Sequence, residues 1–223
     1  MERERNEHFV RVPARTVSLE GDLTLPEGAQ EIVLFAHGTG STRFSNRKRH
    51  IARILNESGL ATLLIDLLSP EEEAVDQETA AFRFDIGLLA ERLTSTIDWL
   101  RSASETRKLR IGLFGAGTGA AAALVTAAAR PRSVSAVVCR SGRPDLAGSA
   151  LPKVQAATLL IVGGADGTVL EVNGEAYEQL RCEKKLHIIP GATHQFEEPG
   201  ALDEVARLAR QWFDGHLAAL KPG

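Results

Sequence analysis

The sequence contains only two cysteines, Cys139 and Cys182, and they form neither a disulfide framework nor a metal-binding pattern. We therefore expect no disulfide and no metal centre, and we interpret Cys139, inside an apolar run, as a small core residue. We also expect no cofactor. No apolar segment reaches the roughly 18–20 residues that a membrane-spanning helix needs. The charged N-terminus, Met-Glu-Arg-Glu-Arg-Asn-Glu-His, does not resemble a secretory signal. These absences favour a soluble, cytoplasmic protein.

An excess of charge of either sign is also missing, because the net charge is only −3. Nothing in this balance indicates binding to nucleic acid or to an anionic membrane surface. The 223 residues suit one compact α/β domain spanning residues 1–223, without an internal repeat or a linker that would divide it. The oligomeric state is not indicated by the sequence.

Continuous apolar runs recur along the chain and predict strands that are buried on both faces. They are Ile32–Ala36, Leu60–Ile65, Leu109–Phe114, Val134–Cys139, Thr158–Val162 and Leu186–Ile189. Apolar residues at helical spacing lie between or after them, at 51–55, 86–100 and 202–213. This alternation predicts an α/β fold with a doubly wound, mostly parallel sheet flanked by helices.

Two further segments complete the predicted architecture. Residues 10–25 alternate apolar and polar positions around Pro13 and Gly21-Asp22, which favours short antiparallel strands at the N-terminal sheet edge. The acidic stretch with Glu71–Glu73 and Asp76 is predicted to be an exposed loop, or a partial lid. Little chain separates the run ending at Cys139 from the next at Thr158, so we expect no large cap domain and a shallow, open site.

Three predicted strand ends carry residues that suit hydrolytic chemistry. A glycine-dense turn, Gly115–Gly119, follows the predicted strand 109–114. Asp166 follows the strand 158–162, and His194 follows the strand 186–189. Ligands of open α/β sheets bind beyond the carboxyl ends of the strands. The chain order of elbow, acid and histidine is the order found in α/β-hydrolases.

The expected nucleophile is absent from this pattern. The motif at the strand-to-helix elbow of such enzymes is G-x-S-x-G, and here it is Gly115-Ala-Gly117-Thr-Gly119. Glycine has no side chain that could attack a substrate. The sequence leaves open whether Gly117 is an engineered substitution, the residue of a natural pseudoenzyme, or part of a repurposed site.

Over nearly its whole length the chain resembles the α/β-hydrolases of the dienelactone hydrolase-like group. The matching segments are His37-Gly-Thr-Gly40, Gly115–Gly119, Gly163-Gly-Ala-Asp166 and His194-Gln-Phe-Glu-Glu-Pro199. The resemblance implies an α/β-hydrolase fold and hydrolysis of a small carboxylic ester or lactone. It also implies that Asp166 orients His194 as general base, with Gly117 at the nucleophile position. The backbone N–H groups of Thr118 and of Thr39 or Gly40 would form the oxyanion hole.

The glycine sets the functional expectation. Without a hydroxyl at position 117 there is no covalent acyl-enzyme at this position, so we expect the chain to be inactive or strongly impaired in acyl transfer. A water molecule in the vacated space, activated by His194, would allow hydrolysis without a covalent intermediate. Cys139 and Ser141 follow a neighbouring strand and are not expected to replace the nucleophile.

Two other functions stay open on the sequence alone. A natural pseudo-hydrolase would bind a small ligand or a partner protein. Alternatively, Gly115-x-Gly117-x-x-Ala120 satisfies the dinucleotide fingerprint, and Arg140 at the end of the following strand could meet the 2′-phosphate of NADP. Against this second alternative, the motif lies in mid-chain and leaves Asp166 and His194 unexplained.

Several arginines are candidates for binding a carboxylate on the substrate, because a guanidinium can bind a carboxylate through two hydrogen bonds. Arg43 and Arg83 are the first candidates, and Arg140 and Arg143 are similar to them. The simpler interpretation of Arg43 and of Arg47–Arg49 is a solvated, charged face.

Overall fold

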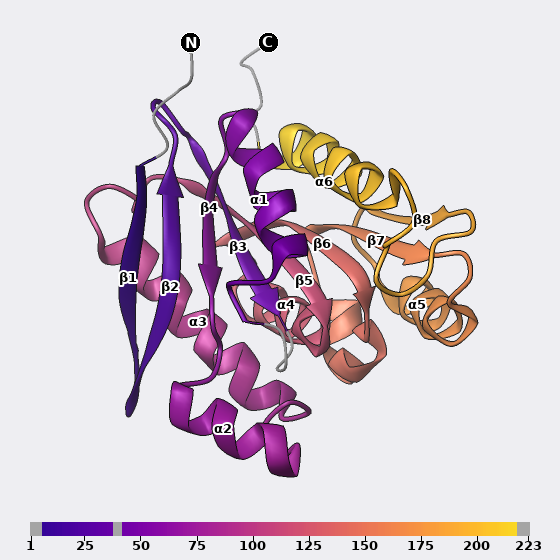
Figure 1. Cartoon of the computed structure of the whole chain (residues 1–223), viewed down its shortest axis with the longest axis horizontal. Coiled ribbons are helices and arrows are strands. Elements are labelled where there is room, and N and C mark those ends of the chain that lie inside the picture. The colour runs from indigo at the N-terminus through magenta and orange to yellow at the C-terminus, as the bar shows by residue number, and fades with distance from the viewer. Residues whose placement is uncertain (1–5, 38–41, 218–223) are drawn as a thin grey trace.

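The computed structural model describes residues 6–37 and 42–217, which form one mixed sheet with helices on both faces (Figure 1). The strands are β1 (Asn6–Ala14), β2 (Val17–Leu25), β3 (Glu31–His37), β4 (Ala61–Ile65), β5 (Arg110–Gly117), β6 (Val134–Gly142), β7 (Ala157–Gly163) and β8 (Lys184–Ile189). The helices are α1 (Asn46–Glu57), α2 (Pro70–Thr79), α3 (Ile86–Ser102), α4 (Thr118–Ala129), α5 (Gly167–Gln179) and α6 (Ala201–Leu217), with a 3₁₀ segment η1 (Pro144–Lys153).

The eight strands are arranged in the order β1-β2-β4-β3-β5-β6-β7-β8. The pairs β1–β2 and β2–β4 are antiparallel, and all remaining pairs are parallel. The predicted doubly wound, mostly parallel sheet with an antiparallel N-terminal edge is therefore confirmed. The edge differs in one detail, because the chain turns at Arg15, whose φ is 52°, and β2 continues straight through Gly21 and Asp22.

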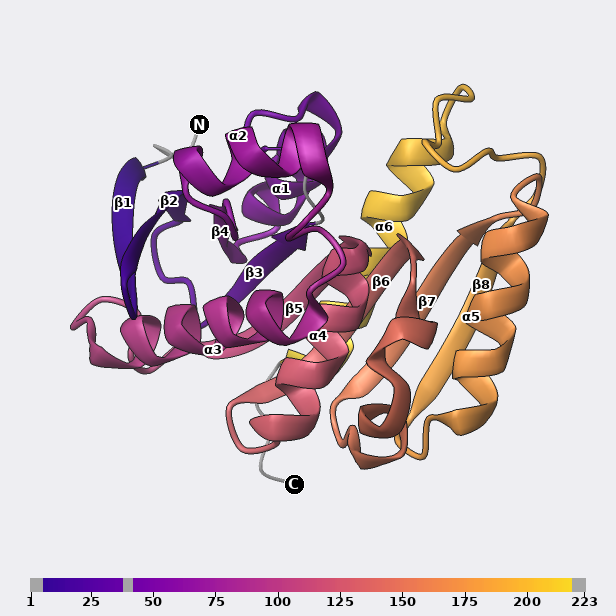
Figure 2. The ribbon, with the colours of Figure 1, turned by 90° about the horizontal axis from the view of Figure 1, so that it is seen from below.

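Two apolar layers cover the sheet, one on each face. Figure 2 shows α3, α4 and α5 on one face and α1 and α6 on the other. The first layer packs leucines and alanines of α3 and α4 against the strands, and the second packs α1 and α6 against Val33, Phe35 and Phe114. In this second layer, Phe35 and Phe114 stack with their ring centroids 4.9 Å apart. Burial of these layers provides the main stabilisation of the fold.

The acidic segment expected to be an exposed loop is the helix α2. Its N-cap is Ser69, whose hydroxyl accepts from the backbone N–H of Glu72, while the Glu72 carboxylate accepts from the Ser69 N–H. Pro70 at the first helical position adds a preset φ angle. Asp76 is fully buried, so the prediction of an exposed acidic loop is wrong at this residue.

The parallel strands β3, β5, β6, β7 and β8 end at the same edge of the sheet. Within the described ranges no cap domain is inserted above this edge, since only η1 lies between β6 and β7. None of the helices in these ranges combines the length and hydrophobicity needed to cross a bilayer.

Candidate active site

The turn from β5 into α4 has the backbone geometry of a nucleophile elbow. Gly117 is the N-cap of α4, with φ 57° and ψ −131°, a conformation that side-chain-bearing residues rarely adopt. A Cβ atom built on Gly115 would lie 2.5 Å from the Cα of Ala120, so only glycine lets the strand and the helix approach this closely. The neighbouring strand is equally tight, because a Cβ on Gly142 would lie 2.3 Å from the Cβ of Ala120.

Gly117 itself faces open space. A Cβ atom at this position would meet no atom within 4 Å among the residues that the structure describes. Its carbonyl oxygen accepts a 3.0 Å hydrogen bond from the backbone N–H of Arg143, which fixes the turn from the side of β6. The described residues therefore leave room for a Cβ atom at the elbow, and the backbone turns sharply from strand to helix there, as it does at the G-x-S-x-G motif.

Asp166 follows β7 and has two partners, one for each carboxylate oxygen. Its Oδ1 accepts from the backbone N–H of Val169 at 3.4 Å, which makes it the N-cap of α5. Its Oδ2 lies 2.7 Å from Nδ1 of His194. The same carboxylate therefore holds both the start of α5 and the imidazole of His194.

His194 lies in the loop after β8, and that loop is tied to the end of β7. The backbone N–H of Ala165 donates to the carbonyl of Ala192 at 2.9 Å, and that of Gly164 donates to Ile189 at 2.8 Å. A Cβ on Gly163 would lie 2.4 Å from the Ala192 oxygen, so glycine is needed for this contact. With Nδ1 occupied by Asp166, Nε2 is the imidazole nitrogen left for a substrate or a water. The His194 side chain is 46% exposed, so this nitrogen belongs to an open site.

The oxyanion hole stays a prediction. The first turn of α4 has no side-chain cap, which leaves the backbone N–H of Thr118 without a capping acceptor at the helix N-terminus. The second expected donor, Thr39 or Gly40, lies outside the described residues.

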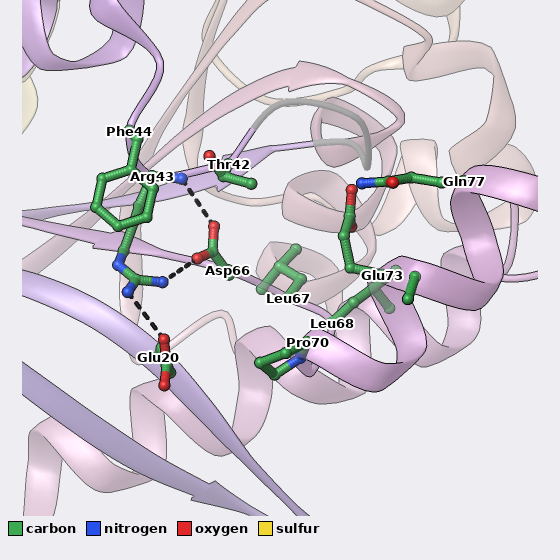
Figure 3. A pocket seen from close by; sticks show the side chains of 11 residues that line it. Glu20, Thr42, Arg43, Phe44, Asp66, Leu67, Leu68, Pro70, Glu73 and Gln77 are labelled. Carbon is green, nitrogen blue, oxygen red and sulfur yellow. Dashed lines mark hydrogen bonds and ion pairs between the residues drawn. The ribbon is translucent and has the colours of Figure 1, made fainter.

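Arg43 does not lie on a solvated face, because only 8% of it is exposed. Its guanidinium forms ion pairs with Asp66 and, at 2.8 Å, with Glu20, and its backbone N–H donates to Asp66 at 2.7 Å (Figure 3). The same group lies 4.4 Å from the centre of the Phe44 ring. The structure thus places Arg43 in an ion-pair network at the carboxyl end of β4.

Arg83 and Arg143 also have carboxylate partners of their own. The Nε of Arg83 donates to buried Asp76 at 3.0 Å, and its terminal nitrogen binds the Asp76 carbonyl at the end of α2. Arg143 pairs with Asp145 at 2.7 Å, two residues along the chain. Substrate binding by Arg43 or Arg83 would have to compete with these internal acceptors.

Arg140 differs from the other three arginines. It is only 9% exposed, its Nε has no hydrogen-bond partner, and no described carboxylate forms an ion pair with it. Burial, with a contribution from the nearby charge of Arg47, lowers the pKa of Arg140 to about 10. Sequence alone could not single out Arg140, because the partners of a side chain depend on elements far away in the chain.

Cys139 and Ser141 both lie in β6 beside the elbow. Cys139 is fully buried, as expected, and burial raises the pKa of its thiol to about 12, which keeps it protonated and unreactive. Ser141 is the extra residue of a β-bulge, since Ala116 pairs with Arg140 and Gly117 pairs with Gly142. The φ of Ser141 is 37°, and its buried hydroxyl has no partner within the described part of the chain.

A pocket of about 330 Å³ lies beside the Arg43 network. Leu67, Leu68 and Pro70 form an apolar floor, and Phe44, Glu73 and Gln77 stand around it (Figure 3). The sequence did not indicate this pocket, because it depends on α2. In the described ranges, no group of three or more His, Cys, Asp or Glu side chains comes together as a metal site.

The sheet order, the glycine elbow and the acid and histidine at the following strand ends define the α/β-hydrolase fold. Residues 19–219 match the model of the dienelactone hydrolase family, and the chain belongs to that family. It is 56% identical to a crystallised dienelactone hydrolase from Anabaena variabilis, with a TM-score of 0.94 over 96% of this chain and 99% of that one.

A more distant solved structure shows the same fold. It is a dienelactone hydrolase-like promiscuous phosphotriesterase from metagenomic libraries, 16% identical, with a TM-score of 0.78 over 96% of this chain and 99% of that one. At this identity the likeness concerns the fold alone.

Curated relatives come from two strains of Mycobacterium tuberculosis and are named provisionally as phosphoribosyl transferases. Each is 52% identical over 213 residues, which cover 96% of this chain but only 47% of the relative. The chain therefore spans about half the length of these relatives.

Proposed function

We propose that this chain binds small esters or lactones at the carboxyl edge of its sheet, and that its covalent acyl-transfer chemistry is strongly impaired. The supporting observation is the combination of a 2.7 Å Asp166–His194 contact with an elbow whose central residue, Gly117, offers open space and no nucleophile. Removing one member of a catalytic triad typically leaves only about 10³–10⁴-fold catalysis over water. We expect the chain to have activity of that order at most.

The residual chemistry that we propose is general-base hydrolysis. The Nε2 of His194 would take a proton from a water molecule in the space before Gly117, and that water would attack the ester carbonyl. The Thr118 N–H would stabilise the oxygen that becomes negative. If this is correct, His194→Ala abolishes the residual rate. An unchanged rate would exclude the mechanism.

Other functions have weaker support. The name of the M. tuberculosis relatives would suggest phosphoribosyl transfer, but it describes proteins of which this chain matches only about half. A pseudo-hydrolase that only binds a ligand or a partner is the main alternative, and the missing side chain at Gly117 favours it. NADP binding through Gly115-x-Gly117-x-x-Ala120 would leave the Asp166–His194 contact without a purpose.

The free thiols of Cys139 and Cys182 support the further proposal of a cytoplasmic location.

The test is a comparison of three chains on a short activated ester such as p-nitrophenyl acetate. We expect Gly117→Ser to exceed the parent chain by at least about 10³-fold in kcat/KM, the scale of triad losses. Gly117→Ala, which adds the Cβ without the hydroxyl, should remain at the parent rate. A serine variant as slow as the alanine variant would favour the pseudo-hydrolase.

A further inference from the structure

Arg140, beside the elbow, carries a positive charge for which the described part of the chain supplies no counter-ion. Arg140 is 9% exposed, its Nε has no acceptor, and its guanidinium lies 5.5 Å from the centre of the Phe196 ring. An aromatic face offsets only part of the lost hydration of a buried cation. A buried cation without an anion destabilises a folded protein, so the arrangement indicates a site that an anion completes.

The start of α1 provides a second, independent feature of an anion site. Its N-cap, Ser45, makes no side-chain cap hydrogen bond, and the first turn contains no acidic residue. That turn instead carries Arg47, Lys48 and Arg49. Uncapped N–H groups and the helix dipole make such an N-terminus attractive to an anion, and the basic side chains add to this attraction.

The two features lie close together, because Arg47 in the first turn of α1 lines the same surface pocket as Phe196, against whose ring the Arg140 guanidinium packs. Burial lowers the pKa of both Lys48 and Arg140, and the charges of Arg140 and Arg47, respectively, contribute to these shifts. Lys48 is 7% exposed and donates to the carbonyl of Thr42 at 3.1 Å, just before α1 begins. Two buried basic side chains, Arg140 from β6 and Lys48 from α1, are therefore grouped with the N-terminus of α1.

Carboxylates also lie near Lys48 and Arg47 at the start of α1. Asp66 and Glu73, which line the pocket in Figure 3, attract Lys48, and Glu197 pairs with Arg47 at 3.1 Å. Arg140 has no such partner in the described ranges, so its charge is the one that is not balanced. A ligand held here would also lie beside the elbow, because Arg140 pairs with Ala116, the residue before Gly117.

We propose that Arg140, Lys48 and the N-terminus of α1 form a binding site for the phosphate group of a small-molecule ligand. A phosphate monoester carries close to two negative charges at neutral pH, which suits a guanidinium, an ammonium and a helix end better than a carboxylate with one charge. The arginine fork binds two phosphate oxygens, and the helix amides bind a third. The site does not depend on ester hydrolysis and can be tested without it.

Isothermal titration calorimetry of the parent chain with phenyl phosphate tests this site, with benzoate and inorganic phosphate as comparison ligands. We expect saturable binding of phenyl phosphate, weaker binding of inorganic phosphate, and benzoate at least about 10-fold weaker than phenyl phosphate. Arg140→Gln should weaken phenyl phosphate binding by about 10–100-fold, the value of a charge-assisted hydrogen bond. Arg53→Gln, on the exposed part of α1 where Arg53 pairs with Glu57, should bind as the parent does.

Thermal unfolding separates this proposal from a structural role of Arg140. In phosphate-free buffer, Arg140→Gln should melt at or above the parent temperature, because it removes an unpaired buried charge. At the same concentration, phenyl phosphate should raise the melting temperature of the parent chain more than that of this variant. Lys48→Gln and Arg140→Lys, which keeps the charge without the fork, should both bind more weakly than the parent. Equal affinity in all of these variants, or benzoate bound as tightly as phenyl phosphate, would overturn the proposal.

Discussion

The imidazole of His194 is held by Asp166 through a 2.7 Å contact between Nδ1 and Oδ2, and the same carboxylate caps α5 through Oδ1. One residue thus joins the loop after β8 to the start of a helix after β7. Because the two oxygens have separate partners, orientation of the imidazole and stability of the helix can be altered independently.

Substitution of Asp166 should separate these two roles in the Gly117→Ser background. Asparagine caps helices about as well as aspartate does, so Asp166→Asn should retain the stability of the fold. It should still lower esterase kcat by about 10⁴-fold, because an amide does not enforce the required imidazole tautomer. Ester hydrolysis and urea unfolding of the same preparations check both expectations.

Asp166→Ala serves as the matched variant for the cap. It should lose the same activity and, in addition, about 0.5–2 kcal/mol of unfolding free energy, because the N-terminus of α5 loses its cap. Equal stabilities of the asparagine and alanine variants would show that the 3.4 Å contact to Val169 contributes little.

The backbone at Gly117 predicts a cost for any side chain placed there. With φ at 57° and ψ at −131°, both Gly117→Ser and Gly117→Ala should lose about 1–3 kcal/mol of unfolding free energy. The open space around the Cβ position adds no steric clash to this strain. Chemical denaturation should give the same loss for both variants, and a much larger loss in either would mean that the elbow is more crowded than the structure shows.

A side chain at Gly115 should lower the unfolding free energy for a different reason, which is a steric clash. Gly115→Ala would place a Cβ 2.5 Å from the Cα of Ala120, so β5 and α4 would have to move apart, at about 1–3 kcal/mol or more. Gly174→Ala is the control, since its Cβ would meet nothing within 4 Å in the middle of α5. That control should gain up to about 1 kcal/mol from helix propensity. Thermal or urea unfolding of the two alanine variants should give shifts of opposite sign.

We expect Lys48 to make the unfolding free energy of the chain depend on pH. Burial lowers the pKa of its ammonium to about 7, against an ordinary value of 10.5 that applies to the unfolded chain. Between these values the unfolded chain binds the proton that the folded chain has released, so the Lys48 contribution to stability rises with pH. In phosphate-free buffer, the unfolding free energy of the parent minus that of Lys48→Met should increase from pH 7 to 10, by at most about 1.4 kcal/mol per pH unit.

Lys153→Met is the control for this pH series, because Lys153 is exposed. The difference between the parent and this variant should not change with pH. If the Lys48→Met difference is equally constant, the ammonium of Lys48 is hydrated more fully than its burial indicates.

Much of the fold was predictable because strands buried on both faces leave long apolar runs in the sequence. The runs at 109–114 and 134–139 mark β5 and β6, although both strands extend further, to Gly117 and Gly142. The turn at Arg15 was missed, since a non-glycine residue at positive φ leaves no compositional signal. The helix α2 was missed because its acidic residues resemble a loop, yet Ser69 and Glu72 form a capping box that could have indicated it.

The site was predictable only where its residues lie in the loops just after predicted strands. Asp166 and His194 were found because each directly follows a strand that ends at the same sheet edge. The burial of Arg43 depends on Glu20 and Asp66 from β2 and the end of β4, and the isolation of Arg140 depends on which elements pack around it. No local pattern encodes these long-range partners, so the sequence could not rank the arginines.

If the nucleophile is the main element missing from the site, a serine at position 117 should make the site reactive. Mass spectrometry of the intact chain after incubation with a fluorophosphonate, a reagent that phosphonylates an activated serine, measures this reactivity. We expect one stoichiometric adduct at position 117 of the Gly117→Ser variant, greatly slowed by His194→Ala in the same background, and none at that position in the parent or in Gly117→Ala. A Gly117→Ser variant that folds but stays unlabelled would contradict the proposed site.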